Sequence, residues 1–301
     1  MAGLKELRVR ISSITSTQKI TSAMKMVAAA RLRKSQDTLQ KFQAYFSDLL
    51  RATGRLLNEM QAEEKKGKIV YLRPQIMRQS AQDDTYLLVV FSSDKGLCGS
   101  YNANILKECL RRVNELSSLG KKVKVLSLGK KAGEALIRRC SDVEVEIVND
   151  FAAKGPNYSE IESLVQRLVE RFGKDFDVCE IICTHFHSAI NREVRTEQFL
   201  PLKFETEGEE YTNVVNGAVY GYEQNKQSVL FDLVPMAAVS IMFQMLLNAQ
   251  TSEQGARMTS MDNATRNASD MISKLTLKYN RLRQSAITTE LIEIISGAEA
   301  L

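Results

Sequence analysis

The chain has only four prolines among its 301 residues, and all of them lie between residues 74 and 235. A proline inside a helix removes a backbone hydrogen bond and clashes with the preceding turn, so it is the strongest local barrier to a long helix. The first 73 and the last 66 residues are free of it. Each end can therefore form one uninterrupted helix, whereas the middle must be built from shorter elements.

Both terminal segments have the apolar spacing of a coiled-coil seam, which alternates steps of three and four residues. In the first segment the pattern comprises Leu4, Leu7, Ile11 and Ile14, followed by Ile20, Met24 and Val27. In the last segment it comprises Met261, Ala264, Ala268, Met271, Leu275 and Leu282. We predict one helix over residues 1–60 and a second over residues 236–301, which at 1.5 Å per residue are far longer than ordinary globular helices.

The middle of the chain, residues 61–235, changes to the pattern of an α/β domain. Four β-branched apolar runs of strand length are Thr85–Ser92, Lys122–Leu128, Val143–Val148 and Val178–Thr184. Helical stretches lie between them, near 103–116, 131–139 and 160–172, and a polar, Gly- and Asn-bearing connection follows at 205–225. The predicted fold is a Rossmann-like α/β domain inserted between two long helices that form an antiparallel coiled coil.

Positive charge is concentrated at the N-terminus. Residues 1–60 carry 11 Lys and Arg against 4 Asp and Glu, although the whole chain has a net charge of only +5. Such a face could meet nucleic acid, an anionic membrane surface or an acidic protein. Residues 1–41 contain no Phe or Tyr on which bases could stack, so the sequence favours an acidic protein partner over nucleic acid.

Motifs for bond chemistry are weak. The turn at residues 93–100 (SDKGLCGS) has the place of a phosphate-binding loop, but neither G-x-G-x-x-G nor G-x-x-x-x-G-K-[ST] occurs. Cys98 could be a nucleophile at a helix start, yet no convincing His partner is present in the sequence. Cys179, Cys183, His185 and His187 share one strand-like run without the paired spacing of a zinc site. We therefore expect no catalytic residue, cofactor or metal.

The chain also carries few targeting signals. The start MAGLKELRVRI has no apolar core or cleavage site of a secretory signal. The longest apolar stretch, 234–247, is shorter than the roughly 20 residues that cross a bilayer. Five cysteines, an odd number without framework spacing, suit a reducing compartment.

Three segments together resemble one family, the gamma subunits of F-type rotary ATP synthases. They are TQKITSAMKMVAAARLRKSQ at 17–36, SDKGLCGSYNANI at 93–105 and SEQGARMTSMDNATRNASDMISKLTLKYNRLRQSAITTELIEIISGAEAL at 252–301. The resemblance implies a central shaft, in which the coiled coil runs inside a hexamer of alternating alpha and beta subunits. The α/β domain would lie outside, near the epsilon subunit and the membrane ring of c subunits. Such a shaft performs no bond chemistry and couples proton flow to conformational changes of the beta subunits.

Residue by residue, the resemblance implies three contact regions. Met24, Arg257, Gln284 and Thr288 match family residues that touch the beta subunits, whose acidic loop suits the basic helix. Ile287, Leu291, Ile294 and Ile295 would form an apolar tip that turns in a hydrophobic sleeve. Tyr220 and Tyr222 would lie at the foot near the c-ring.

The departures from the family pattern are few. GLCGSYN replaces the more frequent GLCGGLN, and residues 61–84 are longer and more charged than expected. Lack of a presequence favours the cytoplasmic face of a bacterial plasma membrane over the matrix face of the mitochondrial inner membrane. Two alternatives remain at this point, a nucleotide-using enzyme of Rossmann type and a helical nucleic-acid binder.

Overall fold

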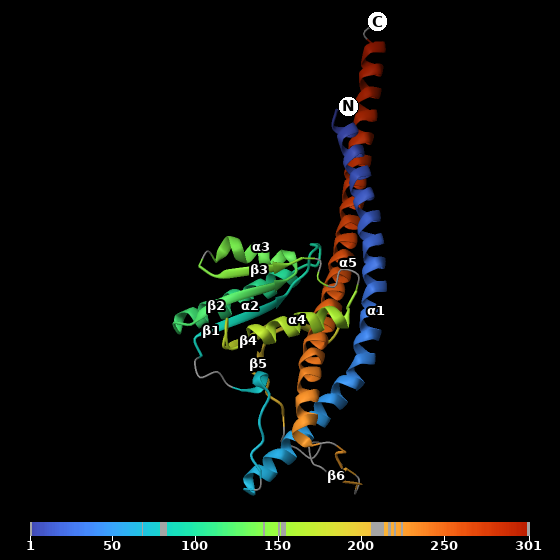
Figure 1. Ribbon diagram of the computed structural model, residues 1–301. Coiled ribbons are helices and arrows are strands. Elements are labelled where there is room, and N and C mark those ends of the chain that lie inside the picture. Colours follow the sequence, from blue (N-terminus) through green and yellow to red (C-terminus); the bar gives the residue numbers. More distant parts are fainter. Residues whose placement is uncertain are drawn as a thin grey trace. The chain divides into compact units, whose positions relative to one another are not determined.

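A computed structural model describes residues 2–67, 69–78, 83–140, 142–149, 151, 155–205, 214–215, 218–219, 221–223 and 225–299. Two long helices, α1 (Ala2–Lys65) and α5 (Lys226–Glu299), begin and end the chain (Figure 1). The chain divides into two compact units. We call residues 1–31 with 257–301 the helix-pair unit, and residues 32–256 the sheet unit.

The sheet unit is built on five strands in the order β3-β2-β1-β4-β5. The parallel strands are β1 (Thr85–Phe91), β2 (Lys122–Leu128), β3 (Glu144–Val148) and β4 (Val178–Phe186). The edge strand β5 (Arg192–Leu200) pairs antiparallel with β4. A short 3-10 helix, Gln75–Met77, precedes the sheet, and a small antiparallel pair, β6 (Val214–Val215) with β7 (Ala218–Val219), follows it.

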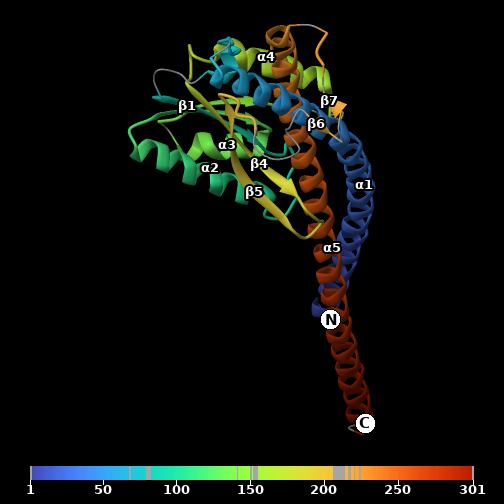
Figure 2. The same cartoon turned by 90° about the horizontal axis from the view of Figure 1, so that it is seen from below.

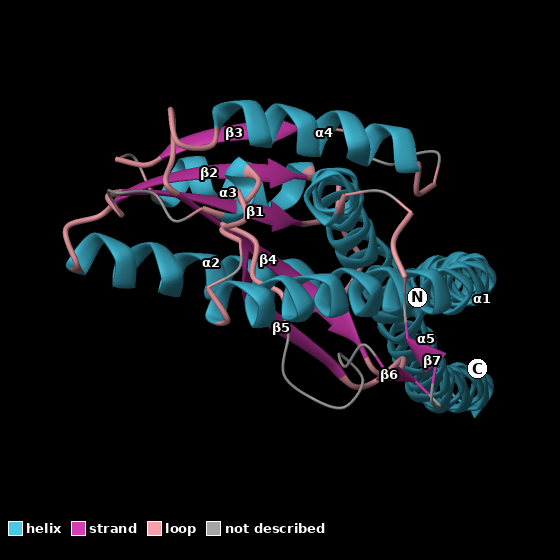
Figure 3. Ribbon diagram, turned by 60° about the horizontal axis from the view of Figure 1, so that its bottom comes forward, coloured by secondary structure: helices cyan, strands magenta, loops and turns pink. Residues whose placement is uncertain are grey.

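Three helices connect the parallel strands and divide the sheet faces between them. They are α2 (Tyr101–Ser118), α3 (Lys130–Arg139) and α4 (Tyr158–Arg171). Leu88 and Val90 of β1 pack with α2 and α3, whereas Leu87 and Val89 face α4 and the nearby parts of α1 and α5. Figure 3 shows α2 and α4 on opposite faces of the sheet. The alternation along β1 thus makes two cores, as expected for a sheet covered on both faces.

Segments of the two long helices belong to the core of the sheet unit. Phe42 of α1 meets Phe243 of α5 edge to face at 4.9 Å, and Gln244 donates to Gln43 at 2.5 Å. On the sheet side, Asn248 of α5 accepts from the backbone of Phe186 at 3.3 Å, and Figure 2 shows α5 passing beside β4 and β5. The sheet is therefore held on helices that extend beyond it.

In the helix-pair unit the two helices run antiparallel. The Thr265 hydroxyl donates to that of Thr21 at 2.9 Å, and Lys25 Nζ lies 2.5 Å from Asp262 Oδ1. Salt bridges and hydrogen bonds from Arg266 and Lys25 lower the pKa of Asp262. Polar side chains thus join the helices directly.

The expected seam is wrong at two positions. Ile20 is 60% exposed and Val27 is 54% exposed, while Ala28 is buried. The seam passes through Thr21, Lys25 and Ala28 because Thr265 and Asp262 satisfy the two polar side chains. Spacing of apolar residues alone therefore assigns the wrong face here, and part of the apolar surface of α1 is left exposed.

Helix α5 begins ten residues before the predicted start and contains Pro235. An internal proline costs a helix about 3 kcal/mol, but Leu230 and Val234 are fully buried in the core on its N-terminal side and hold this turn in place. One 18-residue stretch of α5 is apolar enough to cross a membrane, with a mean hydropathy of 1.9. Of that stretch 56% is buried inside the protein, as in a core helix.

Gly129, between β2 and α3, provides a test of this packing. Its φ of +119° is rare for other residues, and a Cβ there would lie 2.2 Å from the backbone oxygen of Ser92. Gly120 also has a positive φ, +73°, but nothing lies within 4 Å of its Cβ position. We expect Gly129→Ala to lower the free energy of unfolding by about 3 kcal/mol or more, and Gly120→Ala by only about 1 kcal/mol. Equal urea midpoints for the two variants would contradict this account.

Candidate interaction surfaces and the crevice of the sheet

The crevice at the carboxyl ends of β1 and β2 is occupied by the chain's own groups. Asp94 Oδ1 accepts from the backbone amide of Lys130 at 3.0 Å, and the Ser93 carbonyl accepts from that of Lys131 at 3.1 Å. The Ser92 hydroxyl accepts from the amide of Ala132 at 3.3 Å. Many α/β folds bind phosphate at such a helix start through these same amides. At α3 they are already used.

Cys98 is part of an internal network. Its side chain is buried, and Asn102 Nδ2 donates to its sulfur at 3.2 Å. Asn102 Nδ2 also donates to the Ser93 hydroxyl at 2.7 Å. The preceding residue, Leu97, has a φ of +64° and is 59% exposed. The network fixes the β1–α2 turn and covers the thiol, which does not favour a nucleophilic role.

The Cys and His residues of β4 do not converge. Cys179 and Cys183 are fully buried, and burial raises the pKa of both thiols. His185 Nε2 lies 3.0 Å from Glu197, and His187 Nε2 lies 3.6 Å from Glu193. Within the described ranges, no three His, Cys, Asp or Glu side chains are grouped so that they could hold a metal ion.

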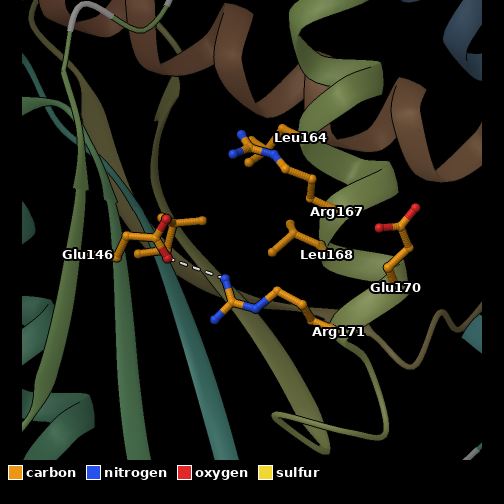
Figure 4. Close-up of a pocket in the computed structure, with 7 residues that line it drawn as sticks. Glu146, Leu164, Arg167, Leu168, Glu170 and Arg171 are labelled. Carbon is orange, nitrogen blue, oxygen red and sulfur yellow. Dashed lines mark hydrogen bonds and ion pairs between the residues drawn. The ribbon is translucent and has the colours of Figure 1, made fainter.

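A small cavity of about 130 Å³ lies between α4 and strands β2 and β3 (Figure 4). Its lining comprises Leu126, Glu146, Leu164, Arg167, Leu168, Glu170 and Arg171. Arg171 Nη1 pairs with Glu146 at 3.2 Å across it, and Arg171 also pairs with Asp175 at 2.9 Å. The guanidinium is thus engaged by the chain's own carboxylates, and the cavity has the character of a gap bridged by an ion pair.

The predicted beta-subunit contacts all lie in the helix-pair unit. Met24 and Arg257 are half-buried, whereas Gln284 and Thr288 are exposed. The Thr288 hydroxyl donates to the Gln284 carbonyl of its own helix at 3.0 Å. The amide of Gln284 lies on the exposed surface of α5, where a partner can reach it.

The end of α5 extends beyond α1. Helix α1 begins at Ala2, 19 residues before Thr21, and an equal step beyond Thr265 ends at Gln284. Figure 1 likewise shows α5 continuing past the N-terminus. The predicted tip residues are exposed by 49–65%, namely Ile287, Leu291, Ile294 and Ile295. A single helix with such apolar side chains in water calls for a partner.

At the other end of the helices, the predicted foot residue Tyr222 lies in a charged cluster, while Tyr220 is outside the described residues. Lys226 Nζ pairs with Glu59 at 2.5 Å and with Glu63 at 2.7 Å, and lies 5.6 Å from the centre of the Tyr222 ring. Burial, and then the nearby Glu59 carboxylate, raise the pKa of Tyr222 to about 12. Sequence reasoning missed this cluster because Glu59 and Lys226 are 167 residues apart.

The chain matches known proteins over its full length. A family model described as ATP synthase matches residues 3–301. The ATP synthase gamma chain of Rhodospirillum rubrum is 41% identical over 306 residues, and that of Erythrobacter litoralis is 42% identical over 305 residues. Each alignment covers 100% of both chains.

Solved structures agree with the fold. A chain of the mitochondrial ATP synthase of Euglena gracilis, solved with OSCP, F1 and c-ring, has a TM-score of 0.65 at 17% identity and covers 99% of this chain and 94% of that one. A central stalk and c-ring structure from Tetrahymena thermophila has a TM-score of 0.56 at 25% identity, with coverage of 81% and 99%. The Rossmann-like domain between long helices is thus confirmed as the fold class, and the chain belongs to the family of ATP synthase gamma chains.

Proposed function

We propose that this chain is the central rotating shaft of an F-type ATP synthase. It couples proton flow through the membrane sector to conformational changes of the catalytic beta subunits. The observation that carries this proposal is the pair of antiparallel helices, joined at Thr21–Thr265 and Lys25–Asp262, within a chain of the gamma family. Rotation of such a rod can favour a different state of each beta subunit only through contacts that differ between those states.

The shaft role is non-catalytic. The start of α3 is capped by Ser92, Ser93 and Asp94, the thiol of Cys98 is covered, and the sequence has no phosphate-loop motif. These observations support a subunit that transmits force while bond chemistry takes place on its partners. They disfavour the alternative of a nucleotide-using enzyme.

The partner surfaces follow from the exposed parts of the helices. Met24, Arg257, Gln284 and Thr288 contact beta subunits, and the tip formed by Ile287, Leu291, Ile294 and Ile295 turns in the apolar sleeve of the alpha–beta hexamer. Residues 1–60 and 236–301 serve as the shaft, and residues 61–235 as the domain that faces the epsilon subunit. The exposure of the tip and the basic charge of residues 1–60 support this assignment.

The foot near Tyr220 and Tyr222 meets the c-ring. Similarity to rotor structures that contain a c-ring supports this contact. The complex then places the chain peripherally on the cytoplasmic face of a bacterial plasma membrane, in agreement with gamma chains of bacteria such as Rhodospirillum rubrum.

Met24→Lys tests the contact with the acidic beta loop. An added surface charge pair contributes up to about 1 kcal/mol, which slows release of each contact about fivefold. We expect normal assembly of the variant complex, with fewer protons pumped per ATP hydrolysed. Both quantities are measured in inverted membrane vesicles.

Met26→Lys is the matched control, because Met26 is 68% exposed and lies two residues away on a different face of α1. It adds the same charge at another angle and should change the proton to ATP ratio less. An unchanged ratio in Met24→Lys would show that this contact does not limit rotation.

Arg257 and Gln284 test contact at two heights. They are 27 residues apart on α5, about 40 Å along the axis. Replacing either by Ala should remove about 1 to 3 kcal/mol of preference for one rotary angle. Multi-site ATP turnover should therefore fall, while the affinity of the hexamer for its first nucleotide stays the same. Asp270→Ala, exposed between them on the same helix, should leave turnover unchanged.

A cysteine at position 257 or 284 gives the second measurement. We expect each to crosslink to a beta subunit, to stop turnover when oxidised, and to recover with reductant. If the cysteines instead crosslink only to residues 61–235 of their own chain, with full activity, the shaft proposal fails.

A further inference from the structure

A polar pocket of about 150 Å³ lies in the sheet unit at the amino end of α2. The lining comes from α2 (Ser100, Tyr101, Asn104), the end of β4 (Thr184), and the following turn and β5 (Ile190, Arg192, Val194). It is separate from the α3 start and from the cavity beside α4, with which it shares no residue. Neither the proposed shaft contacts nor the family motif assign a role to it.

The pocket stands where the direction of winding reverses. From β1 the chain moves outward to β2 and β3, and then returns to β4 on the other side of β1. In open α/β sheets the crevice at such a switch point, beyond the carboxyl ends of the strands, is the usual place for a ligand. Helix α2 begins just after β1, and Thr184 lies near the end of β4.

Hydrogen-bond donors dominate this pocket. The first-turn amides of α2 have no partner within the helix, and the Ser100 side chain makes no cap hydrogen bond. The 18-residue helix adds the positive end of its dipole. Asn104 Nδ2 donates to the Ser100 hydroxyl at 3.4 Å and carries a second hydrogen.

Thr184 is the independent sign that a ligand is missing. It is 2% exposed, and its Oγ1 has no hydrogen-bond partner in the part of the chain that the structure describes. The hydroxyl lies close enough to Tyr101 to lower the pKa of that phenol, but the phenol itself donates to the Ala249 carbonyl at 3.1 Å. A buried hydroxyl without a partner costs about 1 to 3 kcal/mol, so a bound acceptor would be stabilising.

Arg192 supplies the charge. Its guanidinium is half-buried, donates to the Ala189 carbonyl at 2.5 Å, and has burial as the cause that lowers its pKa. On the same strand Glu193 is engaged by Arg195 at 2.7 Å. Gly255 lets α5 pass close to Arg192, since a Cβ there would lie 3.5 Å from Nη1. One carboxylate, Glu253, acts on Tyr101 but does not line the pocket.

We propose that this pocket binds a small tetrahedral oxyanion, with inorganic phosphate as the representative ligand. Arg192 and the first turn of α2 neutralise its charge, and the Thr184 hydroxyl donates to one of its oxygens. Donors from a helix, a strand end and an arginine fork approach from different sides, which suits four oxygens better than the two of a carboxylate. The volume is below that of pockets for larger ligands, so a nucleoside is excluded.

The test is titration of the full-length chain with sodium phosphate, at constant ionic strength set with sodium chloride, followed by calorimetry and ³¹P NMR. We expect saturable binding of one phosphate per chain. Arg192→Gln, which removes the charge and keeps the length, should weaken it about tenfold or more. Thr184→Val, which keeps the shape without the hydroxyl, should also weaken it, by several-fold. Circular dichroism checks that both variants are folded.

Arg195→Gln is the matched control, because Arg195 is exposed on the same strand and pairs with Glu193. It should bind phosphate like the unaltered chain, and sulfate should compete better than acetate. Absence of saturable binding, equal loss in Arg195→Gln and Arg192→Gln, or stronger competition by acetate would each overturn the proposal. None of these results bears on the shaft contacts, because every measurement uses the isolated chain.

Discussion

Two helices as long as α1 and α5 cannot remain ordered in water without a partner, and the rest of the chain follows from that constraint. Helix propensity alone is weak, so each helix must bury one face along its length. Where α1 and α5 meet within the helix-pair unit, polar pairs such as Lys25–Asp262 set their register. Where they meet within the sheet unit, Phe42 and Phe243 pack between them. The α/β insertion adds a sheet to helices that also pack against each other.

The sequence predicted the elements whose signals are local. The prolines bound the two helices, and the apolar runs place β1, β2 and β4 within two residues. Strand β5 was missed because REVRTEQ reads as polar, and it is an edge strand with alternating exposed positions. Its side chains can be charged because one neighbour, β4, provides all of its backbone pairing.

Features that depend on residues far apart in the sequence were beyond such reasoning. The polar seam could not be read from α1, because Thr21 and Lys25 become suitable only when Thr265 and Asp262 lie opposite. The same is true of the foot cluster and of the capped start of α3, where Asp94 comes from a different loop. The predicted contact residues on α5 stand on exposed surface, but their partners belong to other molecules, so their roles remain proposals.

The lone end of α5 has a consequence for friction. Dispersion and hydrophobic contacts have little directional preference, unlike hydrogen bonds. A helix covered by isoleucine and leucine against a smooth apolar wall would have an energy that changes little with angle. Such a contact holds the axis in place without creating deep minima around the circle. Angular steps must then come from the few polar groups, such as Gln284, that stand just before this end.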